Sequence, residues 1–224
     1  MREQGTMTKL YLIRHGKTEW NLAGRYQGAN GNSPLLPQSH QDIVRLASYL
    51  AGHQFAAAYT SPLLRAKETA TELVAALDTT IPLVVEPGLR EVNLGQLEGM
   101  YFTDAEKRWP RLIDDFHHHA DRYNASLING ESFEAVIERM KAAFANIAQA
   151  HPNEAVLVVS HGAALNAGIN GALGSDLVHL KDRGGLSNTS TTILETLDGG
   201  QTFTLLDWNN TAYLDRESDP TDTI

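Results

Sequence analysis

Two segments of the sequence place a histidine and a glycine one residue beyond the end of an apolar run. The run Leu10–Ile13 is followed by Arg14–Gly16 (Arg-His-Gly), and a second run, rich in valine, is followed by Ser160–Gly162 (Ser-His-Gly). Short apolar runs of this kind indicate buried strands. Parallel strands bring their carboxyl ends to one edge of a sheet, where open α/β sheets bind ligands. We therefore expect His15 and His161 to face each other across one crevice.

Two further polar residues complete a set that suits phosphoryl chemistry. Arg65 lies in the first turn of a helix for which we predict Ser61 as N-cap and Pro62 as the first helical residue. Glu91 lies in a glycine-containing loop. The guanidinium groups of Arg14 and Arg65 match pairs of phosphate oxygens. An unprotonated histidine is a nucleophile at neutral pH, and a carboxyl group can protonate the leaving oxygen.

The elements that must position these residues alternate between strands and helices. Apolar periodicity predicts helices at Ser39–Leu50, Ser61 to about Leu77, Phe102 to about His119 with a break near Pro110, Glu131–Ala150 and Ala163 to about Leu173. Strands are predicted at Leu10–Ile13, Phe55–Thr60, Pro82–Val85, Val156–Val159, Thr191–Thr196 and Thr202–Trp208. This alternation predicts an α/β fold, a three-layer α/β/α sandwich with a mostly parallel central sheet.

The chain of 224 residues fits a single domain. We assign residues 9–214 to it, with residues 1–8 as a flexible lead-in and residues 215–224 as a disordered acidic tail. Residues at about 100–130 are expected to form a helical lid, which contains His117, His118 and His119.

Composition excludes several classes of protein and of site. The chain has no cysteine, which rules out disulfides, thiolate nucleophiles and cysteine-based metal sites and fits a cytoplasmic location. The net charge of −9 argues against nucleic acid or an anionic membrane as a partner. We find no apolar run of about 20 residues that could span a membrane. A homodimer is left open.

Five blocks of sequence, in order along the chain, resemble the histidine phosphatase superfamily in its branch of phosphoglycerate mutases and broad-specificity phosphatases. The blocks are Leu12–Thr18 with Asn21, Arg25–Gly28 with Ser33–Leu35, Ser61–Ala66 with Thr69 and Ala70, Leu89–Glu91 with Gly95, Glu98 and Gly99, and Val159–Gly162. The resemblance covers nearly the whole chain and implies the phosphoglycerate mutase-like fold.

The resemblance also implies a role for each matching residue. His15 would be the phosphorylated nucleophile, Glu91 the proton donor, and Arg14, Arg65 and His161 the phosphate pocket. Residues expected to contact phosphate or substrate are Lys17, Asn21, Gln27, Gly28 and Gly162, with Asn188 as a weaker assignment. No metal or organic cofactor is implied. The expected ligand is a small phosphorylated metabolite or inorganic phosphate.

Lys17 departs from the family pattern, which usually has glutamate there. It adds a positive charge beside the site, and it either favours an anionic substrate or points to solvent.

Three functions remain as hypotheses. A phosphatase of small phosphate monoesters is preferred because the segment between Glu91 and His161 lacks the long basic insertion of true mutases. A phosphoglycerate mutase, an isomerase acting by phosphoryl transfer, is the alternative. A non-catalytic module that binds phosphorylated ligands is a third, against which the intact set of His15, Glu91 and His161 argues.

Several other patterns are given plainer interpretations. Gly16-Lys17-Thr18 resembles the end of a P-loop, but the glycine required five positions before Gly16 is replaced by Tyr11. The three consecutive lid histidines cannot point in one direction on a helix, which argues against a metal site. Glu98 competes with Glu91 for the acid role, but it is expected to brace the loop.

Overall fold

The computed structural model describes residues 6–78, 80–216 and 220–223. At the centre of these residues is a six-stranded sheet with the order β3-β2-β4-β1-β5-β6. Its strands are β1 (Thr8–Arg14), β2 (Ala57–Thr60), β3 (Leu83–Val85), β4 (Ala155–Ser160), β5 (Thr191–Thr196) and β6 (Thr204–Asn210). Strands β1 to β4 are parallel, whereas β5 is antiparallel to both of its neighbours. The predicted α/β fold with a mostly parallel sheet is confirmed.

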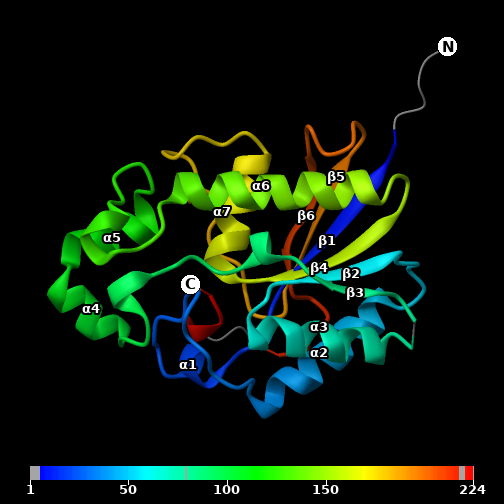
Figure 1. The fold of residues 1–224 in the computed structure, drawn as a ribbon. Coiled ribbons are helices and arrows are strands. Elements are labelled where there is room, and N and C mark those ends of the chain that lie inside the picture. The colour runs from blue at the N-terminus through cyan, green and yellow to red at the C-terminus, as the bar shows by residue number, and fades with distance from the viewer. Residues whose placement is uncertain (1–5, 79, 217–219, 224) are drawn as a thin grey trace.

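Helices cover both faces of the sheet (Figure 1). One face carries α2 (Pro37–Leu50) and α3 (Leu64–Ala76), and the other carries α6 (Phe133–Ala150) and α7 (Gly162–Ala172). The central strand β1 is apolar on both sides: Leu10 and Leu12 pack with α6 and α7, and Tyr11 and Ile13 pack with α2 and α3. Alternation of side chains along a strand therefore produces two cores, one on each face of the sheet.

The close approach of α7 to α6 depends on two glycines. A Cβ atom at Gly168 would lie 2.6 Å from Cβ of Met140, and one at Gly171 would lie 2.5 Å from a side-chain carbon of Ile137. A larger residue at either position would therefore push α7 away from α6. This packing matters for the site because α7 begins at Gly162, directly after His161.

The segment expected to form a lid is helical and lies beyond the end of the sheet (Figure 1). It contains α4 (Phe102–Arg108), α5 (Pro110–His118) and the 3-10 turn η3 (Ala125–Ile128). The predicted break at Pro110 separates α4 from α5, because proline begins α5. Phe116 and Tyr123 join the core of the α6 face. The remaining elements are the short helix α1 (Glu19–Leu22) and the 3-10 turns η1 (Pro87–Leu89), η2 (Gly95–Leu97) and η4 (Pro220–Asp222).

The acidic tail, predicted to be disordered from residue 215 to residue 224, contains a packed turn instead. Asp222 in η4 is only 1% exposed, and its carbonyl accepts a hydrogen bond from the backbone N–H of Asn188 at 3.0 Å. The prediction was wrong here because polar composition does not reveal a buried cationic partner. Lys17 and Arg216 both pair with the Asp222 carboxylate. Residues 217–219 and 224, like residues 1–5 of the lead-in, lie outside the described residues.

Candidate active site

His15 lies just beyond the carboxyl end of β1 and is 3% exposed. Its Nδ1 lies 2.7 Å from the carbonyl oxygen of Gly16, and its Nε2 lies 3.2 Å from Nε of Arg65. A carbonyl can only accept and a guanidinium can only donate, so Nδ1 carries the proton and Nε2 carries the lone pair. Burial, with the charges of Arg65 and Arg14, lowers the pKa of His15 well below its usual value. The ring is therefore neutral at neutral pH, with a nucleophilic nitrogen inside the site.

His161 follows β4 on the neighbouring strand, and the centre of its ring lies 5.1 Å from that of His15. The two histidines thus meet at one edge of the sheet, as the sequence predicts. Nε2 of His161 lies 2.6 Å from Oγ of Ser61, whereas its buried Nδ1 has no partner among the described residues. Burial and the charge of Arg65 lower the pKa of His161 well below its usual value.

Ser61 is a site residue that the sequence reasoning did not assign. It was predicted to cap the following helix with Pro62 as the first helical residue, but α3 begins at Leu64 and its N-cap is Leu63. Two residues thus lie between Ser61 and the helix start, and Ser61 turns its hydroxyl to His161 instead, while accepting from the N–H of Leu63 at 3.2 Å. Its position directly after β2, at the same sheet edge as both histidines, was the signal that could have found it.

Arg14 and Arg65 are buried guanidinium groups with different hydrogen-bonding. Nη1 of Arg14 donates to the carbonyls of Leu186 and Asp222, and its Nε and Nη2 have no partner among the described residues. Arg65 donates from Nη1 and Nη2 to loop carbonyls, including that of Gly31 at 2.9 Å. Arg65 therefore holds the 27–31 loop against the site. Arg14 instead has N–H groups on Nε and Nη2 that could bind an anion.

Glu91 is buried against the first turn of α7. One carboxylate oxygen accepts from the N–H groups of Val92 (2.8 Å) and Ala164 (2.7 Å), and the other accepts from Ala163 (3.2 Å). These backbone donors fix the carboxylate at the start of α7, the helix that follows His161. Glu98, its competitor for the acid role, instead accepts from backbone N–H groups of the 28–30 loop and so braces that loop.

The polar residues predicted to contact phosphate or substrate form different hydrogen bonds around the site. Gln27 bonds to Thr18 through Oε1, and its buried Nε2 has no partner among the described residues. Asn21 accepts from the backbone N–H of Thr18 at 3.1 Å and so shapes the turn that follows His15. Asn188 donates to the carbonyl of His15 at 3.1 Å and so supports the backbone of that residue.

Two glycines in the predicted set are required by close packing. A Cβ atom at Gly162 would lie 3.0 Å from Nε of Arg14, so glycine lets the guanidinium lie against the start of α7. A Cβ atom at Gly28 would lie 2.5 Å from the carbonyl oxygen of Val92. Both glycines are therefore needed because a side chain at either position would collide with its neighbours.

Lys17 lies near the site, and its ammonium contacts the tail. Nζ of Lys17 lies 2.9 Å from Oδ1 of Asp222, and the Lys17 side chain is 11% exposed. The alternative that Lys17 points to solvent is therefore wrong. The carbonyl of Asp222 accepts from Arg14, so Lys17 and Arg14 meet on the same tail residue.

Within the described residues, no group of three or more metal-ligating side chains is arranged to hold a metal ion. The three lid histidines contact other side chains and do not converge on one point. Nε2 of His117 lies 3.0 Å from the hydroxyl of Tyr26, whereas His118 and His119 both approach Asp114. No described helix is long and apolar enough to cross a membrane.

Comparison with known families gives one match over most of the chain. Residues 10–211 match the family model described as histidine phosphatase superfamily (branch 1). A metal-independent phosphoserine phosphatase of Arabidopsis thaliana is 31% identical over 216 residues, which cover 96% of this chain and 86% of the relative. A protein of Photorhabdus laumondii named "Probable phosphoglycerate mutase GpmB" is 32% identical over 171 residues, 75% of this chain and 76% of the relative.

Solved structures give the same picture of the fold. YhfR of Bacillus stearothermophilus is 35% identical with a TM-score of 0.85, covering 93% of this chain and 100% of the other. A mutant phosphoserine phosphatase of Entamoeba histolytica, solved with phosphoserine, is 28% identical with a TM-score of 0.78. The match covers 92% of this chain and 99% of the other.

Proposed function

Because the chain belongs to branch 1 of the histidine phosphatase superfamily, we propose that it is a phosphatase that hydrolyses small phosphate monoesters through a phosphorylated His15. The observation that carries this proposal is the lone pair on Nε2 of His15, which lies 3.2 Å from Nε of the buried Arg65 in a site where the charge of the buried Arg14 also lowers the pKa of the ring. Buried polar atoms without partners are rare and call for an explanation. The partnerless donors of Arg14 and Gln27 are explained if a phosphoryl group lies between them.

In the first half of the reaction, Nε2 of His15 attacks phosphorus and the bond from phosphorus to the ester oxygen breaks. The protonated carboxyl of Glu91 gives its proton to the leaving oxygen, so the product leaves as a neutral alcohol. The phosphorylated ring keeps its proton on Nδ1, where the carbonyl of Gly16 accepts the hydrogen bond. That bond stabilises the positive charge that develops on the ring.

In the second half, the carboxylate of Glu91 takes a proton from water as the water oxygen attacks phosphorus. The nitrogen–phosphorus bond breaks and its electron pair returns to Nε2 of His15. Inorganic phosphate leaves, and both Glu91 and His15 are restored to their starting states. One carboxyl group thus serves as acid and then as base, as the two-step path requires.

His161 and Arg14 bind the transferring phosphoryl group in this proposal. Oγ of Ser61 accepts from the N–H of Leu63 and lies 2.6 Å from Nε2 of His161, and in this proposal the Ser61 hydroxyl donates its proton to that nitrogen. His161 then carries its proton on Nδ1, which becomes a donor to a phosphoryl oxygen. The first turn of α7, beginning at Gly162, adds the positive end of a helix dipole at the same place.

A phosphoglycerate mutase is the second candidate, because one relative carries that name over three quarters of this chain. A mutase returns the phosphoryl group from histidine to a second hydroxyl, whereas a phosphatase gives it to water. The absence of a long basic insertion between Glu91 and His161 favours water as the acceptor.

The proposal is tested by measuring phosphate release from a panel of monoesters, including phosphoserine, alongside interconversion of 2- and 3-phosphoglycerate. We expect phosphate release from the wild type and at least ~1,000-fold less from His15→Ala, since the nucleophile is lost. His119→Ala, which changes an exposed lid histidine, is the control and should retain activity. Full activity of His15→Ala would refute a nucleophilic role, and rapid interconversion without phosphate release would favour the mutase.

A further inference from the structure

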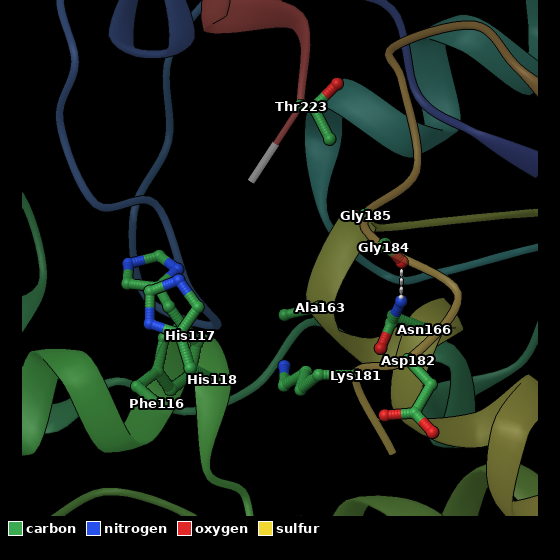
Figure 2. A pocket seen from close by; sticks show the side chains of 10 residues that line it. All are labelled: Phe116, His117, His118, Ala163, Asn166, Lys181, Asp182, Gly184, Gly185 and Thr223. Carbon is green, nitrogen blue, oxygen red and sulfur yellow. Dashed lines mark hydrogen bonds between the residues drawn. The ribbon is translucent and has the colours of Figure 1, made fainter. Parts of the chain in front are cut away.

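A cavity of about 400 Å³ opens at the first turn of α7, and none of the roles described above uses it. Helix α7 contributes Ala163, whose N–H holds the Glu91 carboxylate. Helix α5 contributes Phe116, His117 and His118, and the tail contributes Thr223 (Figure 2). The cavity thus lies next to the proton donor, where the alcohol part of a phosphate ester must be when its oxygen is protonated.

Lys181 supplies the cation of this cavity. Figure 2 shows its ammonium group pointing into the space toward Phe116, with the carboxylate of Asp182 turned away from it. The ammonium lies 4.3 Å from the ring centre of Phe133 and 5.2 Å from that of Phe116. Among the described residues it forms no ion pair with a carboxylate within 4.0 Å. A partly buried ammonium resting on two aromatic rings retains N–H donors for an anion.

The other titratable groups around Lys181 leave it as the principal cation of the cavity wall. Burial, with the charge of Lys181, lowers the pKa of His117 to about 4, so that ring is neutral at neutral pH. His118 pairs with Asp114 at 3.0 Å and its side chain is 68% exposed. Burial lowers the pKa of Lys181 to about 8, and the ammonium form still predominates at pH 7.

A buried amide adds a second polar group to the same wall. Asn166 is 3% exposed and donates through Nδ2 to the carbonyl of Gly184 at 2.6 Å. That bond leaves Oδ1 as the free end of the amide, and this atom is buried with no partner among the described residues. The cavity therefore offers a positive donor and a neutral acceptor from neighbouring elements (Figure 2).

We propose that this cavity binds the alcohol part of the substrate and that Lys181 binds a carboxylate carried on it. Asn166 accepts a hydrogen bond from an N–H or O–H group beside that carboxylate. The substrate class is then the phosphate monoesters of small hydroxy acids, including hydroxy amino acids. This inference rests on the proposed phosphatase activity and adds Lys181 and Asn166 as specificity residues.

The test compares substrates that differ only at the carboxylate, in the full-length protein. Phosphoserine is paired with phosphoethanolamine, which lacks the carboxylate, and 3-phosphoglycerate is paired with glycerol 1-phosphate. We expect the wild type to prefer the carboxylated member by about 10- to 100-fold in kcat/KM, the range of one charged hydrogen bond. Lys181→Met should remove that preference, and Lys181→Arg should keep part of it.

A control variant and a second readout separate recognition from folding. Lys107→Met removes a lid lysine whose side chain is 79% exposed and should leave both pairs unchanged. Lys181→Met should lose far less kcat/KM on p-nitrophenyl phosphate, which has no carboxylate, than on phosphoserine. If Lys181→Met lost kcat/KM equally on both members of a pair, the proposal would be overturned, because the lysine would then have a purely structural role. A wild type without any preference would overturn it too, while leaving phosphatase activity itself intact.

Discussion

At the scale of single residues, the proposed reaction depends on keeping His15 neutral and oriented. Its pKa is lowered mainly by burial and then by the charges of Arg65 and Arg14. Nδ1 is fixed by the Gly16 carbonyl and Nε2 by the Arg65 guanidinium. A protonated ring would have no lone pair for attack, so the lowered pKa extends the nucleophilic form to more acidic pH.

His15 should therefore remain neutral at pH values where an ordinary histidine is already charged. In an NMR titration of its ring protons, we expect a midpoint well below pH 6.5. His179 is an internal comparison, because hydrogen bonding to Asp176 raises its pKa. Arg65→Gln removes one positive neighbour and should move the His15 midpoint to higher pH. A His15 midpoint at or above that of His179 would contradict this assignment.

At the scale of elements, the site is assembled from the ends of strands β1, β2 and β4. His15, Ser61 and His161 each follow one of these strands, and the sheet brings them together. The tail adds a fourth contribution, because the carbonyl of Asp222 holds Nη1 of Arg14 and its carboxylate pairs with Lys17. We expect this contact to direct the other guanidinium nitrogens of Arg14 toward phosphate.

A double-mutant cycle on Lys17 and Asp222 tests that arrangement. Lys17→Met and Asp222→Ala should each weaken inhibition by inorganic phosphate about 10-fold, since each loosens the tail behind Arg14. The double variant should be no weaker than Asp222→Ala alone, because Lys17 acts through its ion pair with the Asp222 carboxylate, which also pairs with Arg216. Additive losses would show that Lys17 contacts phosphate directly. Lys9→Met, which removes an ammonium 3.8 Å from Glu195, is the matched control.

At the scale of the whole molecule, the sequence predicted the sheet and the strand-end residues because both depend on local pattern. Apolar runs identified β1 and β4, and the second residue after each run, His15 and His161, was a candidate site residue. Hydroxyl and backbone partners were harder to predict. Ser61 was expected to cap a helix, and only the fold shows its hydroxyl beside His161.

The tail could not have been predicted from its composition. Asp222 lies 205 positions from Lys17 along the chain (222 − 17), and its burial depends on the cations that surround it there. The cavity around Lys181 likewise combines α5, α7, the tail and the segment after α7, which no local pattern connects. Long-range partners of charged groups are what the three-dimensional structure adds to this sequence.

The most direct test of the account is to trap the phosphoryl group on the enzyme. Labelled substrate is mixed with enzyme, the reaction is stopped in alkaline denaturant within milliseconds, and the modified residue is mapped by mass spectrometry. We expect an acid-labile, alkali-stable phosphoryl group on His15 that disappears at the rate of turnover and is absent from His15→Ala. Continued hydrolysis with no phosphorylated His15 at any time, or with the label on another residue, would contradict the central claim.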